Sequence, residues 1–226
     1  MRLIDLVVDC LKEYLRNGDL NFGVESICDR SAEKNPEYVI ALNNVLLSIN
    51  KGIARLTTAE KLKFKHVVMV GDPTSDVYDI SDYKDIKNIK SVFVVKDGQP
   101  QFIGWTNLDK DHILLGYGLD TNVHMIYAPK MKRFTFDDIG LLGDETNANG
   151  EFKLEPIEDD LDTKYGIDDE MCTYLGYFAK SELWEDVDPD RCKRYLNYFE
   201  QWLVELKNEQ NYPHQTGVSP VYKIKR

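Results

Sequence analysis

"LWEDVDPDRCKRYLNYFEQWL", residues 183–203, is the stretch of sequence that decides the fold. Trp184 ends one run of helical periodicity and Asp188-Pro189 starts the next, because aspartate caps helix N-termini and proline suits the first helical turn. The connection is so short that residues 168–184 and 188–208 are expected to form an antiparallel helical hairpin. The second run carries a broad apolar stripe made of Cys192, Tyr195, Leu196, Phe199, Trp202, Leu203 and Leu206.

Two helices near the N-terminus are expected to cover this broad face, which two helices alone cannot bury. Residues 2–16 repeat apolar side chains at three- and four-residue steps, and a second helix starts at Asn35-Pro36, a good cap followed by a good first residue. We therefore predict an α+β chain with a four-helix core, two helices N-terminal and two C-terminal. Its core residues are expected to be Leu42, Val45, Ile49, Leu175, Phe178, Leu196, Phe199, Trp202 and Leu203.

The middle of the chain has a different period. Residues 66–70, 91–96, 101–106, 112–117 and 123–128 are short segments rich in β-branched and aromatic residues, which is typical of strands. Asp97-Gly98 predicts a hairpin between the second and third of them.

These patterns divide the chain into four parts. Residues 1–62 and 167–208 are expected to form the helical core domain, and residues 63–136 a β-rich insert. Residues 137–166 are acidic and contain Gly, Asn and Pro, so an extended loop or arm is expected there. Residues 209–226 are expected to form an extended C-terminal tail.

The tail has no helical period, carries two prolines and ends in basic residues. Two interpretations stay open for it: a segment that adds to another protein surface, and a frayed terminus. Its candidate binding residues are Tyr212, Val218, Val221, Tyr222 and Ile224.

Composition excludes some classes of function. The 226 residues are 42% hydrophobic, enough to build a core, and carry a net charge of −11. Such a charge disfavours a surface that grips duplex DNA, which needs Lys and Arg. It fits a wall that DNA slides past, although it also serves solubility. Asp5, Asp9 and Glu13 interrupt the apolar N-terminus, so we predict no signal peptide, a cytosolic product and no membrane partner.

Residues 71–85 are the main candidate for metal chemistry, because carboxylates bind Mg²⁺ or Ca²⁺. They concentrate Asp72, Asp76, Asp79, Asp82 and Asp85. The even spacing in a turn-rich stretch, with no His among these residues, fits a solvated connection better.

Other motifs give little support to catalysis. Residues 143–155 approximate an EF-hand loop, but Pro156 stands where the bidentate glutamate is needed. No nucleophile elbow, P-loop or dinucleotide fingerprint is present. We expect no metal and no cofactor. The four histidines share no metal-ligand spacing: His66, His112, His124 and His214. The four cysteines lie far apart in the sequence, which favours buried reduced thiols over a zinc site or a disulfide: Cys10, Cys28, Cys172 and Cys192.

"DDEMCTYLGYFAKSELWEDVDPDRCKRYLNYFEQWL", residues 168–203, follows a helical pair and a β insert, and this order resembles the head–tail connector proteins of tailed bacteriophages. These are the adaptor or gatekeeper rings beneath the portal. The acidic start at 168–170, the Tyr- and Ala-rich helix at 174–179, the restart at 188–191 and the aromatic helix at 195–202 follow the family's order. The long insert and the acidic 137–166 segment depart from it.

The resemblance implies a homo-oligomeric ring, commonly of twelve copies. One side of such a ring binds the portal protein and the other binds the next ring or a tail component. Double-stranded DNA passes through the lumen without sequence-specific binding. The resemblance also implies that the C-terminal tail reaches the portal, and that the protein is made in the host cytoplasm and sits in the virion at the portal vertex.

Our leading hypothesis is therefore a structural virion protein without enzymatic activity. A metal-dependent hydrolase or nuclease that uses the carboxylates of residues 72–85 is the first alternative. A cytosolic oligomeric binding module is the second.

Overall fold

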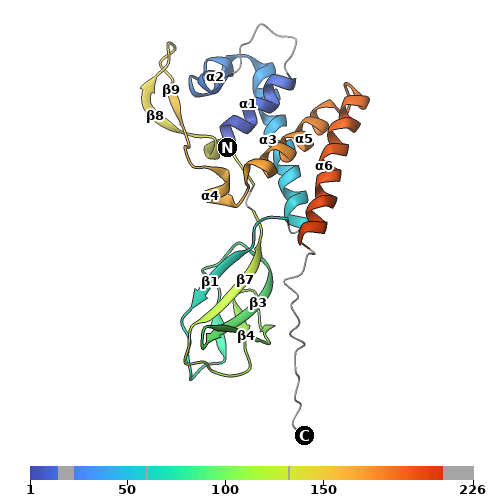
Figure 1. The fold of residues 1–226 in the computed structure, drawn as a ribbon. Coiled ribbons are helices and arrows are strands. Elements are labelled where there is room, and N and C mark those ends of the chain that lie inside the picture. The colour runs from blue at the N-terminus through green and yellow to red at the C-terminus, as the bar shows by residue number, and fades with distance from the viewer. Residues whose placement is uncertain (15–22, 60, 132, 211–226) are drawn as a thin grey trace.

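The computed structural model describes residues 1–14, 23–59, 61–131 and 133–210, and it consists of two bodies joined by a narrow neck (Figure 1). The helical body contains residues 1–62 and 131–210 of that set, and the β domain contains residues 63–130. The chain crosses the neck twice, once after the third helix and once before it returns to the helical body. Each body has its own cluster of buried apolar side chains.

Four long helices form the frame of the helical body: α1 (Leu3–Tyr14), α3 (Pro36–Thr58), α5 (Asp169–Trp184) and α6 (Pro189–Gln210). Side-chain caps fix where α3, α5 and α6 begin. The Asn35 side chain accepts a hydrogen bond from the Glu37 amide at 2.9 Å, and Asp168 accepts one from the Met171 amide at 2.9 Å. Asp188 does the same for Arg191 at 3.0 Å, so the expected restart of the last helix is confirmed.

The expectation of a four-helix core is wrong, although the α+β class is confirmed. The described residues contain six α-helices, and short elements fill the same core as the long ones. α2 (Val24–Cys28) buries Ile27, and α4 (Leu161–Tyr165) buries Leu161. Four further buried side chains of this cluster lie outside the helices: Leu62, Phe134, Ile139 and Ile167. These isolated apolar residues in polar surroundings carry no period, which is why periodicity did not reveal them.

Residues 137–166, expected as an extended loop or arm, are instead largely ordered into elements. The 3-10 helix η2 (Phe136–Asp138) leads into a two-stranded antiparallel sheet of β8 (Gly140–Thr146) and β9 (Phe152–Pro156), which α4 follows. Asn147 holds the hairpin turn, because its buried amide donates to the Asp29 carbonyl at 2.9 Å and its Oδ1 accepts from two amides of the turn. The stretch at 143–155, which approximates an EF-hand loop in sequence, is therefore a hairpin turn that packs against the end of α2.

The core residues named from the sequence lie in the helical body. Leu196 is only partly buried and packs against the cluster, whereas the others are buried: Leu42, Val45, Ile49, Leu175, Phe178, Phe199, Trp202 and Leu203. Arg55 spans the helices above them, with its guanidinium 5.5 Å from the Phe178 ring centroid and 5.8 Å from that of Phe199.

The β domain packs a four-stranded antiparallel sheet, in the order β1-β7-β3-β4, with a three-stranded one in the order β2-β6-β5. The strands are β1 (Lys65–Met69), β2 (Val77–Asp79), β3 (Ile86–Lys96), β4 (Gln99–Ile103), β5 (Thr106–Asn107), β6 (His112–Leu114) and β7 (Val123–Pro129). The expected hairpin between β3 and β4 is confirmed, and Asp97 and Gly98 both have positive φ, as a type I′ turn requires.

Lysines and one aspartate organise the neck. Lys87 on β3 donates to the Thr58 carbonyl at 3.0 Å, which places a cation at the C-terminus of α3, where the helix dipole favours it. Asp85 accepts from Lys65 at 2.7 Å and from the Tyr127 hydroxyl at 2.9 Å. Its carbonyl also accepts from the Lys130 amide at 2.7 Å. The two chain crossings are therefore tied to each other and to the end of α3.

Trp202→Ala is expected to lower the free energy of unfolding by about 3–5 kcal/mol, the usual cost of removing a buried tryptophan. Trp202 is 2% exposed, stacks on Tyr174 at 4.7 Å and donates its indole N–H to Glu170. Urea unfolding followed by circular dichroism measures the change. Val204→Ala on the exposed side of the same helix is the control and is expected to change stability by less than about 0.5 kcal/mol. A Trp202 effect as small as the control would contradict the packing.

Gly52→Ala is expected to destabilise the helical body although alanine is the better helix former. A Cβ at this position would lie 2.5 Å from Leu175 Cδ1 and 2.9 Å from Phe178 Cδ1. Overpacking costs about 1–3 kcal/mol, which exceeds the gain in helix propensity of about 1 kcal/mol. Thermal melting compares it with Gly104→Ala, where the added Cβ meets no atom within 4 Å. An increase in melting temperature for Gly52→Ala would show that the helices separate easily here.

Candidate interaction surfaces

The outer face of the four-stranded sheet carries an aromatic row that crosses all four strands. We define the sheet face as His66 on β1, His124 on β7, Phe93 on β3 and Phe102 on β4. The Phe93 ring stacks on His124 at 5.0 Å between centroids, and Phe102 tilts against Phe93 at 5.7 Å. Alternation places these residues opposite Val92, Val94, Met125 and Ile103, which fill the domain core.

His66 and His124 form a polar centre within this face. Their ring nitrogens Nε2 and Nδ1 lie 3.0 Å apart and the rings are nearly parallel. One ring must donate and the other accept, so the bond needs at least one neutral imidazole. This pairing satisfies part of the polar capacity of an otherwise apolar surface.

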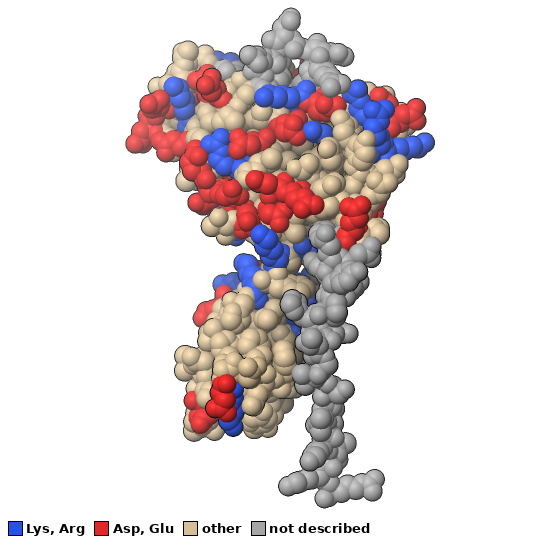
Figure 2. Space-filling model, in the orientation of Figure 1, with Lys and Arg blue, Asp and Glu red and all other residues tan. Residues whose placement is uncertain are grey.

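The apolar side chains on and beside the sheet face are more exposed than apolar side chains on the water-facing side of a sheet normally are. Phe102 is 62% exposed, and Val68 and Val95 beside the row are 48% and 46% exposed. In the orientation of Figure 2, the β domain shows few charged side chains while the helical body shows many. Contiguous exposed apolar area of this kind marks a contact surface.

A second surface lies on the helical body, where α5 and α6 expose stacked tyrosines. We define the tyrosine ladder as Tyr174, Tyr177, Tyr195 and Tyr198. The Tyr177 ring lies 5.7, 5.9 and 5.4 Å from those of Tyr174, Tyr195 and Tyr198 respectively. Tyr198 is 44% exposed and the other three are half-buried. Tyrosine supplies large contact area with a polar tip, which is why it is enriched in interfaces.

Tyr195 anchors the ladder to the first helix. Its hydroxyl donates to Glu13 at 2.9 Å, and burial together with this bond raises the pKa of Tyr195. Lys180 and Asp9 form an ion pair at 2.7 Å between α5 and α1. The ladder is therefore a fixed surface whose base is held by α1.

A third surface is a groove on the hairpin side of the helical body. We define the hairpin groove as the concave volume of about 620 Å³ between the start of α3 and β8. Leu141 and Leu142 of β8 are 60% and 65% exposed. The other apolar walls are Tyr38, Val39, Leu42, Phe136 and Leu154, and the rim carries Arg30, Glu33 and Asp137.

The aspartates of residues 72–85 do not come together as a metal centre. Asp72 Oδ1 accepts from the Thr74 amide and hydroxyl, and these bonds lower the pKa of Asp72. Asp79 caps the Ser81 amide at 2.8 Å, and Asp85 belongs to the neck. Within the described ranges, no group of three or more His, Cys, Asp or Glu side chains is arranged to hold a metal ion.

The remaining polar candidates are local pairs. His112 on β6 bonds Asp109 at 3.0 Å, which raises the pKa of the imidazole. Burial raises the pKa of the Cys10 and Cys172 thiols to about 12, so both stay protonated at neutral pH. A polar cavity of about 600 Å³ in the β domain mixes lysines with acidic residues: Lys84, Lys87, Lys110, Lys130, Asp109 and Asp111.

The tail residues Tyr212, Val218, Val221, Tyr222 and Ile224 lie outside the described residues.

Sequence reasoning missed the sheet face and the hairpin groove. Residues 91–96 gave a signal for the first, because "SVFVVK" is apolar on both alternating sides, where a half-solvated strand has one polar side. The groove has no such signal, because residues far apart in the sequence line it.

No protein-family model matches the chain, and no curated protein matches it either. Across the part of the chain that the structure describes, every helix is too short or too polar to cross a membrane.

Phe102→Ser is expected to leave stability within about 1 kcal/mol of the original while it weakens binding to a hydrophobic-interaction column. Ile103→Ser is the matched control, because the next side chain of β4 is only 8% exposed and points into the domain core. Burying an unpaired hydroxyl and losing the apolar contacts is expected to cost about 2–4 kcal/mol there. Equal destabilisation by the two substitutions would mean that the sheet face is part of a core.

Proposed function

We propose that this protein is a structural, ring-forming connector of a tailed bacteriophage, bound to the portal and joining head to tail. The resemblance of residues 168–203, in the order helical pair, β insert and helical hairpin, supports this assignment. The observation that carries it is the presence of three separate exposed apolar or aromatic surfaces on one short chain. A subunit that contacts like neighbours on two sides and different proteins above and below needs surfaces of this number.

The charge distribution supports the same role. Residues 137–166 contain ten acidic and two basic residues, whereas the β domain is nearly balanced. Acidic side chains cover much of the helical body in Figure 2. A ring whose lumen is lined by such a surface would repel DNA phosphates, and DNA would pass through it without sequence-specific binding.

The proposed ring has commonly twelve copies, with the portal protein on one side and the next ring or a tail component on the other. Its location is the portal vertex of the virion, after synthesis in the host cytoplasm. The C-terminal residues proposed to contact the portal, as an added strand or an extended segment, are Tyr212, Val218, Val221, Tyr222 and Ile224.

Deletion of residues 211–226 tests this proposal. The shortened chain is expected to keep its circular dichroism spectrum and melting temperature, because the buried clusters of the described residues end at Leu203. We expect it to lose co-purification with the portal protein of the same phage, which the full chain retains. Electron micrographs of the full-length mixture are expected to show a ring seated on the portal. Unaltered co-purification of the shortened chain would refute the tail contact, and failure of the full chain to bind would refute the connector assignment.

A further inference from the structure

The neck gathers basic residues in a chain whose net charge is −11. Three segments meet there, at residues 61–65, 84–90 and 129–133. Each segment contains three Lys or Arg, nine in total, and the three segments together contain one Asp. Figure 2 shows Lys and Arg side chains where the two bodies meet. A protein that is acidic overall therefore carries a local concentration of cations at the neck.

Two concave volumes adjoin at the neck. The polar cavity of about 600 Å³ in the β domain is lined by Lys84, Lys87 and Lys130. A second volume of about 310 Å³ lies against the second half of α3 and is lined by Thr58 and Arg133. Lys87 links them, because it donates to the Thr58 carbonyl at 3.0 Å. We define the neck groove as these two volumes together.

Part of the charge in the neck groove is balanced within the protein. Lys51, which lines the second volume, pairs with Glu182 on α5. Lys110, which lines the first, pairs with Asp111 at 3.5 Å. These two lysines are therefore not counted as available to a ligand.

Four further cations line the neck groove, and all four are exposed: Lys84, Lys87, Lys130 and Arg133. Lys84, Lys130 and Arg133 form no ion pair with any other described residue. Asp109 is the remaining acidic residue of the described lining and offsets one charge, so four minus one leaves an excess of three. Asp82, two residues before Lys84, lines neither volume.

We propose that the neck groove binds the phosphate backbone of double-stranded DNA without reading its sequence. A lysine contacts a phosphate as a point charge, and such contacts position DNA but carry no sequence information. A duplex presents one negative charge per about 1.7 Å of its axis, so one duplex can contact cations in both volumes. The site belongs to the single chain and goes beyond the connector function, in which DNA only passes an acidic wall.

The lining favours duplex DNA over two other polyanions. Single strands are held by stacking of their bases on exposed aromatic rings that stand among cations. Among the described residues that line the neck groove, Tyr83 is the only aromatic one, and it is half-buried. A membrane surface is too flat to reach cations that lie in a recess between two bodies.

Fluorescence anisotropy of a labelled duplex with the full chain tests the site. At about 50 mM NaCl we expect a micromolar Kd that is equal for two unrelated sequences of about 20 base pairs. The logarithm of the association constant is expected to fall with the logarithm of salt concentration with a slope of about −3 to −4, from three to four phosphate contacts. Lys84→Gln with Lys130→Gln is expected to weaken binding about tenfold or more and to reduce the size of the slope by about 2.

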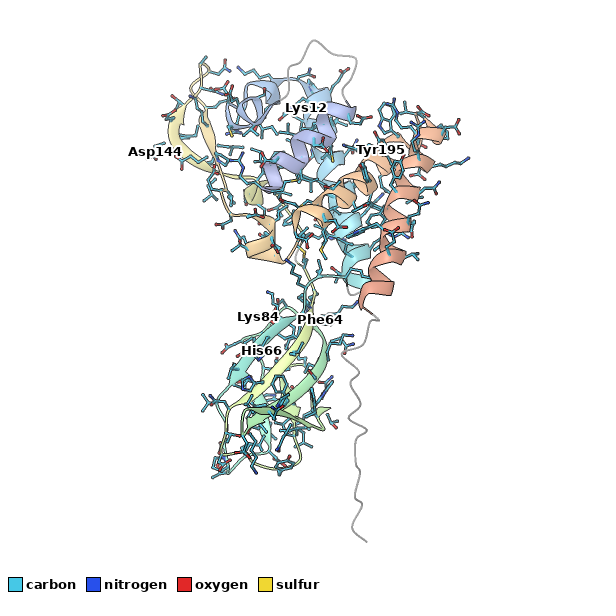
Figure 3. The ribbon with its side chains drawn as sticks, in the orientation of Figure 1. Lys12, Phe64, His66, Lys84, Asp144 and Tyr195 are labelled. Atoms are coloured by element: carbon cyan, nitrogen blue, oxygen red, sulfur yellow. The ribbon has the colours of Figure 1, made fainter. Side chains whose placement is uncertain are left out.

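Lys12→Gln with Lys96→Gln is the matched control, because it removes the same charge from exposed lysines away from the neck. Figure 3 shows Lys12 in the helical body, and Lys96 ends β3 at the hairpin turn. The control is expected to keep the affinity and the slope of the original chain. Equal weakening by both pairs of substitutions would mean that overall charge governs binding, and would overturn the site.

Competition identifies the ligand. Unlabelled duplex is expected to displace the labelled one, whereas inorganic phosphate at the same phosphate concentration is expected not to. Equal displacement by phosphate would indicate a site for a single anion, and equal displacement by polyglutamate would indicate an acidic protein partner. Either result, or no binding at about 50 mM NaCl, would overturn the DNA proposal. None of these results would touch the connector assignment, which portal binding tests separately.

Discussion

The close contact of α3 with α5 at Gly52 is the constraint on which the rest of the structure depends. The glycine lets the α3 backbone approach Leu175 and Phe178 so closely that even a methyl group would collide with them. α3 precedes the β domain and α5 follows it, so this contact joins the two halves of a core that is discontinuous in sequence. α6 then packs on α5, with the Phe178 and Phe199 rings 4.9 Å apart. Because the core closes across the insertion, the β domain can be an excursion without weakening the body that carries it.

The long helices were predictable because their information is local and periodic. Asn35, Asp168 and Asp188 act as caps where the sequence placed them, and the stripe from Phe199 to Leu203 is buried as its spacing indicated. The four-helix core was not correct, because Ile27, Leu161 and Ile139 enter the same cluster from segments without a period. Tertiary contacts, such as the bond from Asn147 to the Asp29 carbonyl, order the acidic segment, and composition does not report contacts of that kind.

The interaction surfaces were less predictable than the core, for a related reason. The tyrosine ladder could be anticipated as a core edge or interface, since its members stand at helical steps beside acidic residues. The sheet face required knowledge of which side of β3 is buried, and a strand that is apolar on both sides leaves that undecided. The hairpin groove required the fold itself, because Val39 and Leu142 are far apart in the sequence. A local sequence pattern predicts individual helices and strands, whereas a surface that several of them form together depends on how they pack.

The neck gives the two bodies a defined relation that does not depend on a shared core. Lys87 reaches from β3 to the C-terminal carbonyls of α3, and Asp85 gathers Lys65, Tyr127 and the Lys130 amide at the point where both chain crossings lie. These are charge-assisted bonds between short segments, so they fix direction with little buried area. A ring built through the helical body would therefore hold every β domain in the same orientation, with the sheet face available to a protein outside the ring. In such a ring, the helical body would set the assembly and the β domain would leave a separate surface for another partner.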